Sequence, residues 1–173
     1  RVRQGQVPAE GEWLVARRQR AGRGRHGRHW LDAPGNFMGS TVVWLAADGP
    51  PPATLAFVAG MALFETVLPL LADPRPLMLK WPNDLLLGEA KLAGILIERE
   101  GDCAIVGIGV NLAAAPMVEG RATGALAMLG PAPARDVFAR ALAARFALEL
   151  GEWRAHGFAP VRRRWLAAAH PPG

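Results

Sequence analysis

Apolar residues recur every three or four positions from residue 134 onward, and this is the clearest pattern in the chain. Spacings of four, four, four and three residues place successive side chains on one face of an α-helix. The members of this face are Phe138, Leu142, Phe146, Leu150 and Trp153. A second helix, about 158–168, is predicted after Gly157. An earlier apolar segment, 52–72, also predicts a helix, which the Asp-Pro pair after it would end.

Shorter segments rich in β-branched and large apolar residues, separated by turn residues, predict strands. These segments are 13–16, 40–47, the two arms of 77–87 around a Pro-Asn-Asp corner, and the hairpin partners 91–100 and 104–112. A Gly-Asp pair joins the last two strands, which is a common hairpin connection. The strands are too contiguous for repeated βαβ units. We therefore expect an α/β (α+β) fold, with a mixed, largely antiparallel sheet and helices on one face.

The size and composition of the chain indicate one globular domain. It has 173 residues, of which 51% are hydrophobic and 20% charged. Its longest apolar stretch, about 53–72, approaches the roughly 20 residues that a membrane span needs. Because Gly60, Glu65 and Pro69 interrupt this stretch, we interpret it as a core helix and expect no membrane partner.

Positive charge is concentrated near the two ends of the sequence. The net charge is +5 and the pI is about 10.9, with clusters in residues 1–29 and at 162–164. Such a charge favours an anionic partner, which could be a nucleotide, a nucleic acid or an acidic protein. The single cysteine, Cys103, excludes an intramolecular disulfide and favours a cytoplasmic protein.

The segment QRAGRGRHGRHW, residues 19–30, combines four arginines with three glycines and no acidic residue. Glycine allows the backbone to pass close to a ligand, and arginine offers a planar fork of donors to phosphate or carboxylate. The segment therefore predicts an anion-binding loop that is mobile until a ligand neutralises it. A solvated basic segment, or one that contacts nucleic acid electrostatically, is the alternative interpretation.

A second stretch, 80–98, places polar side chains at the ends of apolar strands. Asp84 in the Pro-Asn-Asp corner suits a hard cation such as Mg²⁺, although such a residue often only stabilises its own turn. Lys91 begins the apolar run KLAGILI, so its ammonium group is expected at the edge of a buried region. Gly94, in mid-strand, indicates close approach of a ligand or of another backbone.

The third stretch, GIGVNL at 107–112, alternates glycine with β-branched residues and ends in an amide. Its glycine face leaves room for a planar group, to which Asn111 could present a donor and an acceptor; a tightly packed central strand is the alternative. The pattern is neither a dinucleotide fingerprint nor a Walker loop. The four histidines lack metal-ligand spacing, so a zinc site is not expected.

Taken in this order, the three stretches resemble the biotin protein ligase family, that is, biotin–[acetyl-CoA-carboxylase] ligases, and RATGAL at 121–126 is a weaker trait of the same family. The resemblance implies a catalytic domain related to lipoate ligases and class II aminoacyl-tRNA synthetases. It also implies ATP and biotin as substrates, Mg²⁺, and a biotinyl-5′-AMP intermediate. The implied partner is a biotin carboxyl carrier protein, and a homodimer is possible.

The resemblance assigns roles to individual positions. Biotin contacts fall on Gln19, Gly22, Arg23, Gly24, Arg25, Lys91 and Gly94. Contacts to ATP or the adenylate are expected from Arg25, Arg28, Trp30, Lys80, Asn83 and Asn111. Catalytic roles fall on Lys91, Arg23 and Arg25, and a magnesium contact on Asp84.

The sequence also departs from the family pattern. The family's Ser-Thr-Asn biotin motif is not found, because Ser40-Thr41 precedes Val42 and lies downstream of the loop. We expect residues 1–173 to be the catalytic domain without the small C-terminal β-barrel, and without a helix-turn-helix, hence with no DNA partner. The alternatives are a lipoate or octanoyl ligase of the same fold, and a basic nucleic-acid-binding module.

Overall fold

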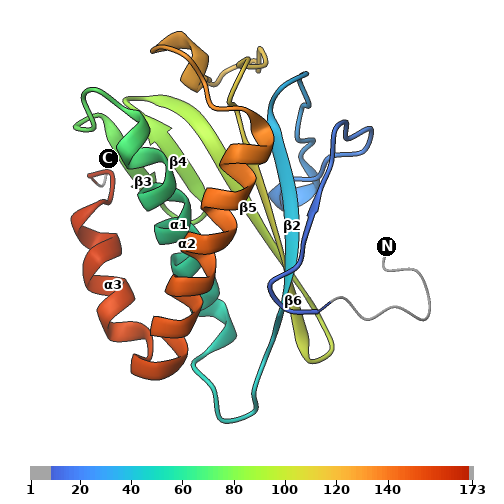
Figure 1. The fold of residues 1–173 in the computed structure, drawn as a ribbon, viewed down its shortest axis with the longest axis vertical. Coiled ribbons are helices and arrows are strands. Elements are labelled where there is room, and N and C mark those ends of the chain that lie inside the picture. The colour runs from blue at the N-terminus through green and yellow to red at the C-terminus, as the bar shows by residue number, and fades with distance from the viewer. Residues whose placement is uncertain (1–8, 172–173) are drawn as a thin grey trace.

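The computed structural model describes residues 9–171, which form one antiparallel sheet with helices on one side (Figure 1). The six strands lie in the order β1-β2-β6-β5-β4-β3, and each named pair is antiparallel. Their bounds are β1 Trp13–Val15, β2 Phe37–Trp44, β3 Leu77–Lys80, β4 Asp84–Leu87, β5 Ala90–Glu100 and β6 Cys103–Val110. The predicted sheet and its hairpin 91–112 are thereby confirmed.

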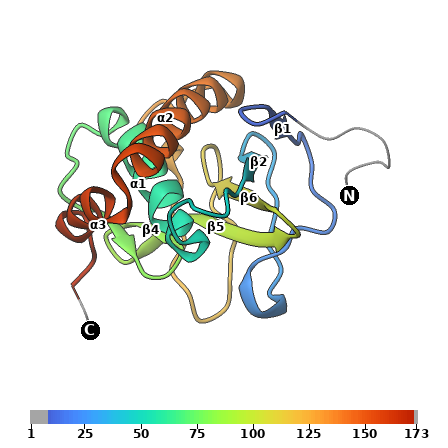
Figure 2. The same cartoon turned by 90° about the horizontal axis from the view of Figure 1, so that it is seen from below.

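Three α-helices cover the same face of the sheet, and Figure 2 shows the other face left to loops. The helices are α1 Leu55–Val67, α2 Arg135–His156 and α3 Phe158–Ala167. Short 3₁₀ turns are η1 Arg25–Gly27, η2 Pro52–Thr54, η3 Leu68–Leu70 and η4 Leu126–Met128. Because the helices occupy one face, the loops on the opposite face are free to form a site.

The core lies between the sheet and the helices. All five residues of the predicted α2 face are buried. They pack against the apolar face of the sheet, where the rings of Phe138 and Phe37 lie 5.3 Å apart. Gly60 lets α1 and α3 approach closely, since a Cβ there would lie 3.3 Å from Nε1 of Trp165.

Two predicted boundaries need correction. The second strand runs from Phe37 to Trp44 and not over 40–47, because apolar residues before Ser40 already pair with β6. The predicted helix 52–72 shrinks to α1 with a 3₁₀ turn at each end, each of which contains a proline. The stretch 52–70 is long and apolar enough to cross a membrane. Nevertheless α1 packs in the core, as the sequence predicted.

Buried and less buried residues alternate along β6, and this alternation determines which residues face the loops. Ala104, Val106, Ile108 and Val110 are buried, whereas the residues between them are less buried. Successive strand residues point to opposite faces of a sheet. The glycines of GIGVNL therefore face away from the helices.

A bidentate ion pair ties the start of the described chain to α2. Both carboxylate oxygens of Glu10 accept hydrogen bonds from Arg154, at 2.6 and 2.7 Å. One of them also accepts the backbone N–H of Trp44 at 2.8 Å. These bonds, the one from Arg154 first, hold the pKa of Glu10 below its usual value even though burial opposes the shift.

A carboxyl group whose pKa is lowered by folding contributes stability above its unfolded pKa and loses it as the pH falls. We expect Glu10→Gln to lower the free energy of unfolding by about 1 kcal/mol at pH 7, because the pair is partly exposed. The difference should shrink as the pH falls below the ordinary value of 4.5. Urea unfolding at pH 7 and pH 3 measures it, with the exposed Glu119→Gln as control. Equal destabilisation at both pH values would contradict a role for the charge.

Candidate active site

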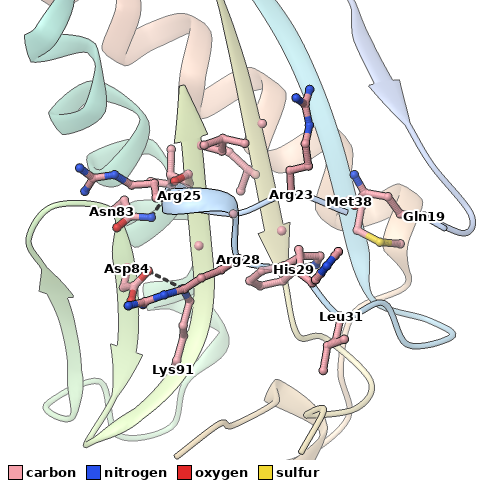
Figure 3. A pocket seen from close by; sticks show the side chains of 18 of the residues that line it. Gln19, Arg23, Arg25, Arg28, His29, Leu31, Met38, Asn83, Asp84 and Lys91 are labelled. Atoms are coloured by element: carbon pink, nitrogen blue, oxygen red, sulfur yellow. Dashed lines mark hydrogen bonds and ion pairs between the residues drawn. The ribbon is translucent and has the colours of Figure 1, made fainter. Parts of the chain in front are cut away.

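A cavity of about 810 Å³ lies on the sheet face opposite the helices, beneath the arginine-rich loop (Figure 3). The predicted site residues that line it are Gln19, Arg23, Gly24, Arg25, Arg28, Trp30, Lys80, Asn83, Asp84, Lys91, Gly94 and Asn111. Gly22 lines a smaller adjoining hollow instead. The structure thus brings together residues that are up to 92 positions apart in the sequence, with the loop and Lys91 facing one space.

The arginine-rich loop folds back on itself as a narrow hairpin. The backbone N–H of Trp30 donates to the carbonyl of Gly22 at 3.0 Å, and that of Gly24 donates to Arg28 at 2.8 Å. A Cβ on Gly22 would lie 2.5 Å from the carbonyl oxygen of Trp30, so only glycine fits there. His26, with φ of 58°, occupies the left-handed region at the tip. The loop's side chains are therefore held on a defined backbone.

The floor of the cavity is made by glycines, and the indole of Trp30 lies on it. A Cβ on Gly109 would lie 2.5 Å from Cε2 of this ring, and one on Gly94 would lie 3.2 Å from Cζ3. The ring centroid is 5.7 Å from Nζ of Lys91, within the range of a cation–π contact. The flat face that the sequence predicted for a planar group is therefore covered by the chain's own indole.

Lys91 is the cation most withdrawn from solvent in the cavity wall. Its side chain is 13% exposed and Nζ lies 2.5 Å from Oδ1 of Asp84. Burial lowers the pKa of Lys91, the contact with Asp84 opposes this shift, and Arg121 and Arg28 add to the lowering. In Figure 3, Arg28 extends from the loop toward the Asp84–Lys91 pair.

The other predicted residues have more open surroundings. Arg23 points away from Lys91 in Figure 3 and pairs with Glu98 at 3.2 Å. Arg25 and Lys80 are exposed at the cavity. Asn83 donates from its side chain to the carbonyl of Ile95 at 2.9 Å. These groups can meet an incoming anion, but their assigned roles stay predictions.

Asn111 is almost fully buried, and its amide is engaged within the protein. Its Nδ2 donates to the carbonyl of Gly124 at 3.0 Å, and its Oδ1 accepts from Asn36 at 3.3 Å. The side chain thus fastens β6 to the segment that follows it. Its predicted contact with a nucleotide stays a prediction that would require these bonds to be exchanged.

Asp84 does not fit the predicted magnesium site in this arrangement. Oδ1 binds Lys91 and Oδ2 binds Arg121 at 2.6 Å, so two cations already neutralise the carboxylate. Within residues 9–171, no group of three or more His, Cys, Asp or Glu side chains could hold a metal ion. The contacts instead indicate that Asp84 positions Lys91.

Arg121 is a charged residue of the cavity wall that the sequence assignment missed. It lies in the loop after β6 and lines the cavity beside Asp84. One available signal was its place at the start of RATGAL, where it is the only cation in the predicted loop 113–124. The pairing with Asp84, 37 residues away, depends on the tertiary fold.

A large cavity with several converging cations and a flat floor suits an anionic substrate that carries a ring system. The fold and cavity thus define an enzyme-like domain for anionic substrates. Residues 3–111 match the model of the biotin/lipoate A/B protein ligase family. The chain belongs to this family.

Individual relatives agree with this assignment. The chain is 41% identical to a Paracoccus denitrificans biotin–[acetyl-CoA-carboxylase] ligase, over 91% of the chain and 70% of the relative. It is 38% identical to the Mycobacterium tuberculosis protein of the same name, over 84% of the chain but only 56% of that relative. The structure of an Aquifex aeolicus biotin protein ligase in complex with biotin and ATP superposes with a TM-score of 0.84 and 27% identity, over 95% of the chain and 71% of that protein.

The contact between Trp30 and the glycine floor is testable in the protein without ligand. We expect Gly109→Ala to expel the indole, because its Cβ would overlap the ring. The loop should then be cleaved several-fold faster by trypsin at Arg23 or Arg25. Gly107→Ala is the matched control, since its Cβ would meet only the carbonyl of Leu96, at 3.6 Å. Equal cleavage of both variants would show that the indole does not hold the loop.

Proposed function

We propose that this chain activates biotin with ATP and transfers it to a lysine of a biotin carboxyl carrier protein. The observation that carries the proposal is the shared cavity, in which the loop cations and Lys91 surround one space. The family membership and the relatives named as biotin ligases support the choice of substrate. The partner inferred from these names is the carrier protein of acetyl-CoA carboxylase.

In the first step, an oxygen of the biotin carboxylate attacks the α-phosphorus of ATP. The bond between that phosphorus and the bridging oxygen to the β-phosphate breaks, which gives biotinyl-5′-AMP and pyrophosphate. Both reactants are anions, so their approach is opposed by charge repulsion. Lys91 and the loop arginines offset this repulsion, most strongly where negative charge builds up in the transition state.

In the second step, the neutral amine of the carrier lysine attacks the acyl carbon of the mixed anhydride. The bond to the AMP oxygen breaks, the amine loses a proton, and an amide forms. This reaction needs no covalent nucleophile from the enzyme. The proposal therefore does not depend on a Ser-His or Cys-His arrangement.

The cavity must rearrange to accept these substrates. The resemblance places the biotin ring against Gly94, and that surface is covered here by Trp30. The indole therefore has to move aside, or to become the wall of the ligand site. Hydrogen bonds at the base of the loop hold the tryptophan near the floor, so loop and ring should move together.

Magnesium would enter this site as part of the substrate. The carboxylate of Asp84 is already paired with two cations, so we propose that Mg²⁺ arrives bound to the phosphates of ATP. Its role is to neutralise phosphate charge.

The free thiol of Cys103 accords with a reducing compartment, and we place the protein in the cytoplasm.

The family description also includes lipoate ligases, so the acid substrate requires a direct test. We expect biotin to support ATP–pyrophosphate exchange by the purified chain, whereas lipoate and octanoate should support little. Exchange with lipoate and none with biotin would reverse the substrate assignment. Salt-sensitive binding of nucleic acid without any exchange would favour the nucleic-acid-binding alternative.

Replacement of Lys91 tests the proposed mechanism. We expect Lys91→Ala to reduce adenylate formation by about a hundredfold or more, because it removes a positioned cation from the reacting groups. The fold should persist, because Lys91 lies near the start of β5. Single-turnover formation of biotinyl-5′-AMP measures the effect, and thermal melting checks the fold. Arg99→Ala, at the far end of the same strand, is the control.

A further inference from the structure

Asp84 holds two cations that come from different parts of the chain. Lys91 lies near the start of β5, and Arg121 lies in the loop after β6. Each takes a different carboxylate oxygen, at 2.5 and 2.6 Å, and the aspartate side chain is only 8% exposed. A buried carboxylate that loses its partners strongly destabilises the folded protein. Asp84 therefore needs at least one of these cations at all times.

Backbone hydrogen bonds hold the segments that carry Lys91 and Arg121 side by side. Lys91 donates its N–H to the carbonyl of Ala122 at 2.9 Å, and its own carbonyl accepts from Gly124 at 3.0 Å. These bonds form a short parallel pairing between Lys91 and Thr123. The segment that carries Arg121 is thereby attached to the strand residue whose side chain shares its carboxylate.

The charges of this group do not cancel. Asp84 contributes one negative charge, and Lys91 and Arg121 contribute one positive charge each, so the group carries a net charge of +1. A pair made of Asp84 and Lys91 alone would be neutral. An approaching anion would then have to compete with the aspartate for the ammonium group. With Arg121 present, Lys91 can turn toward the substrate while Asp84 keeps a partner.

We propose that Arg121 is a positioning residue that acts through Asp84, retaining the aspartate so that Lys91 is free to bind the reacting carboxylate and α-phosphate. This inference rests on the proposed function and extends it to a residue outside the three sequence stretches that suggested it. Arg121 is 39% exposed and lines the cavity, so its contribution must be separated from direct contact with ATP.

A double-mutant cycle makes this separation. We would measure kcat and KM for biotin-dependent ATP–pyrophosphate exchange in the wild type, Asp84→Asn, Arg121→Gln and the double variant. We expect Arg121→Gln to lower kcat about tenfold, with KM for biotin and ATP changed less than threefold. The double variant should be no slower than Asp84→Asn alone, because both substitutions break one unit. Losses that multiply in the double variant would overturn the inference and indicate an independent contact.

Two further variants complete the design. Arg121→Lys should recover kcat to within about threefold of the wild type, because it restores a positive charge beside Asp84. Arg99→Gln, an exposed arginine on β5 outside the cavity, should leave kcat unchanged. If Arg121→Gln does not fold, Arg121→Lys decides: a loss as large as that in Asp84→Asn overturns the inference. A kcat equal to that of the wild type in Arg121→Gln would also overturn the inference.

Failure of the proposed function would give a different result. In that case the wild type itself would show no biotin-dependent exchange. The coupling between Asp84 and Arg121 is then taken from the unfolding free energies of the same four proteins. A measurable coupling free energy would support the part of the inference that says Arg121 retains Asp84. A coupling indistinguishable from zero overturns the inference.

Discussion

Asp84 is a buried carboxylate held between two cations, and the arrangement of the candidate site depends on it. Burial lowers the pKa of Lys91 beside an apolar strand, and the contact with Asp84 opposes this shift. Asp84 also fastens the loop after β6 through Arg121. Without this carboxylate, nothing among these contacts would balance the mutual repulsion of Lys91 and Arg121.

The cavity itself follows from the division of the sheet into two faces. The helices take one face, and the alternation of β6 turns its glycines to the other. Since glycine has no side chain to fill the space, a ring can lie directly on the backbone of β5 and β6. In this structure that ring is Trp30. The same flat floor and neighbouring cations would suit a substrate with a ring system and an acidic tail.

The loop arginines and Lys91 contribute positive charge to the cavity in different ways. The arginines of the loop are exposed and are carried on a narrow hairpin, so they can adjust to an incoming anion. Lys91 is partly buried and paired with Asp84, so its charge already lies at the cavity wall before a ligand binds. A fixed charge in a site of low polarity stabilises a developing negative charge more strongly than a solvated one.

Local patterns were sufficient to predict most of the elements. The face of α2 from Phe138 to Trp153 and the hairpin 91–112 depend on spacing and turn residues, which act over a few positions. The start of β2 was misplaced because Phe37 and Met38 extend the strand through pairing with β6, and that pairing is not local. The ends of α1 shifted because the prolines form 3₁₀ turns there.

The sequence by itself determined the residue types of the site: the arginine-glycine loop, Lys91 in an apolar run, and a glycine-rich strand. Only the tertiary structure decided their partners. It paired Asp84 with Lys91 and Arg121, buried Asn111 beside Gly124, and placed the Trp30 indole against Gly94 and Gly109. The physical reason is that a charge or amide takes whichever partner the fold brings within about 3 Å, and a one-dimensional pattern does not contain that distance.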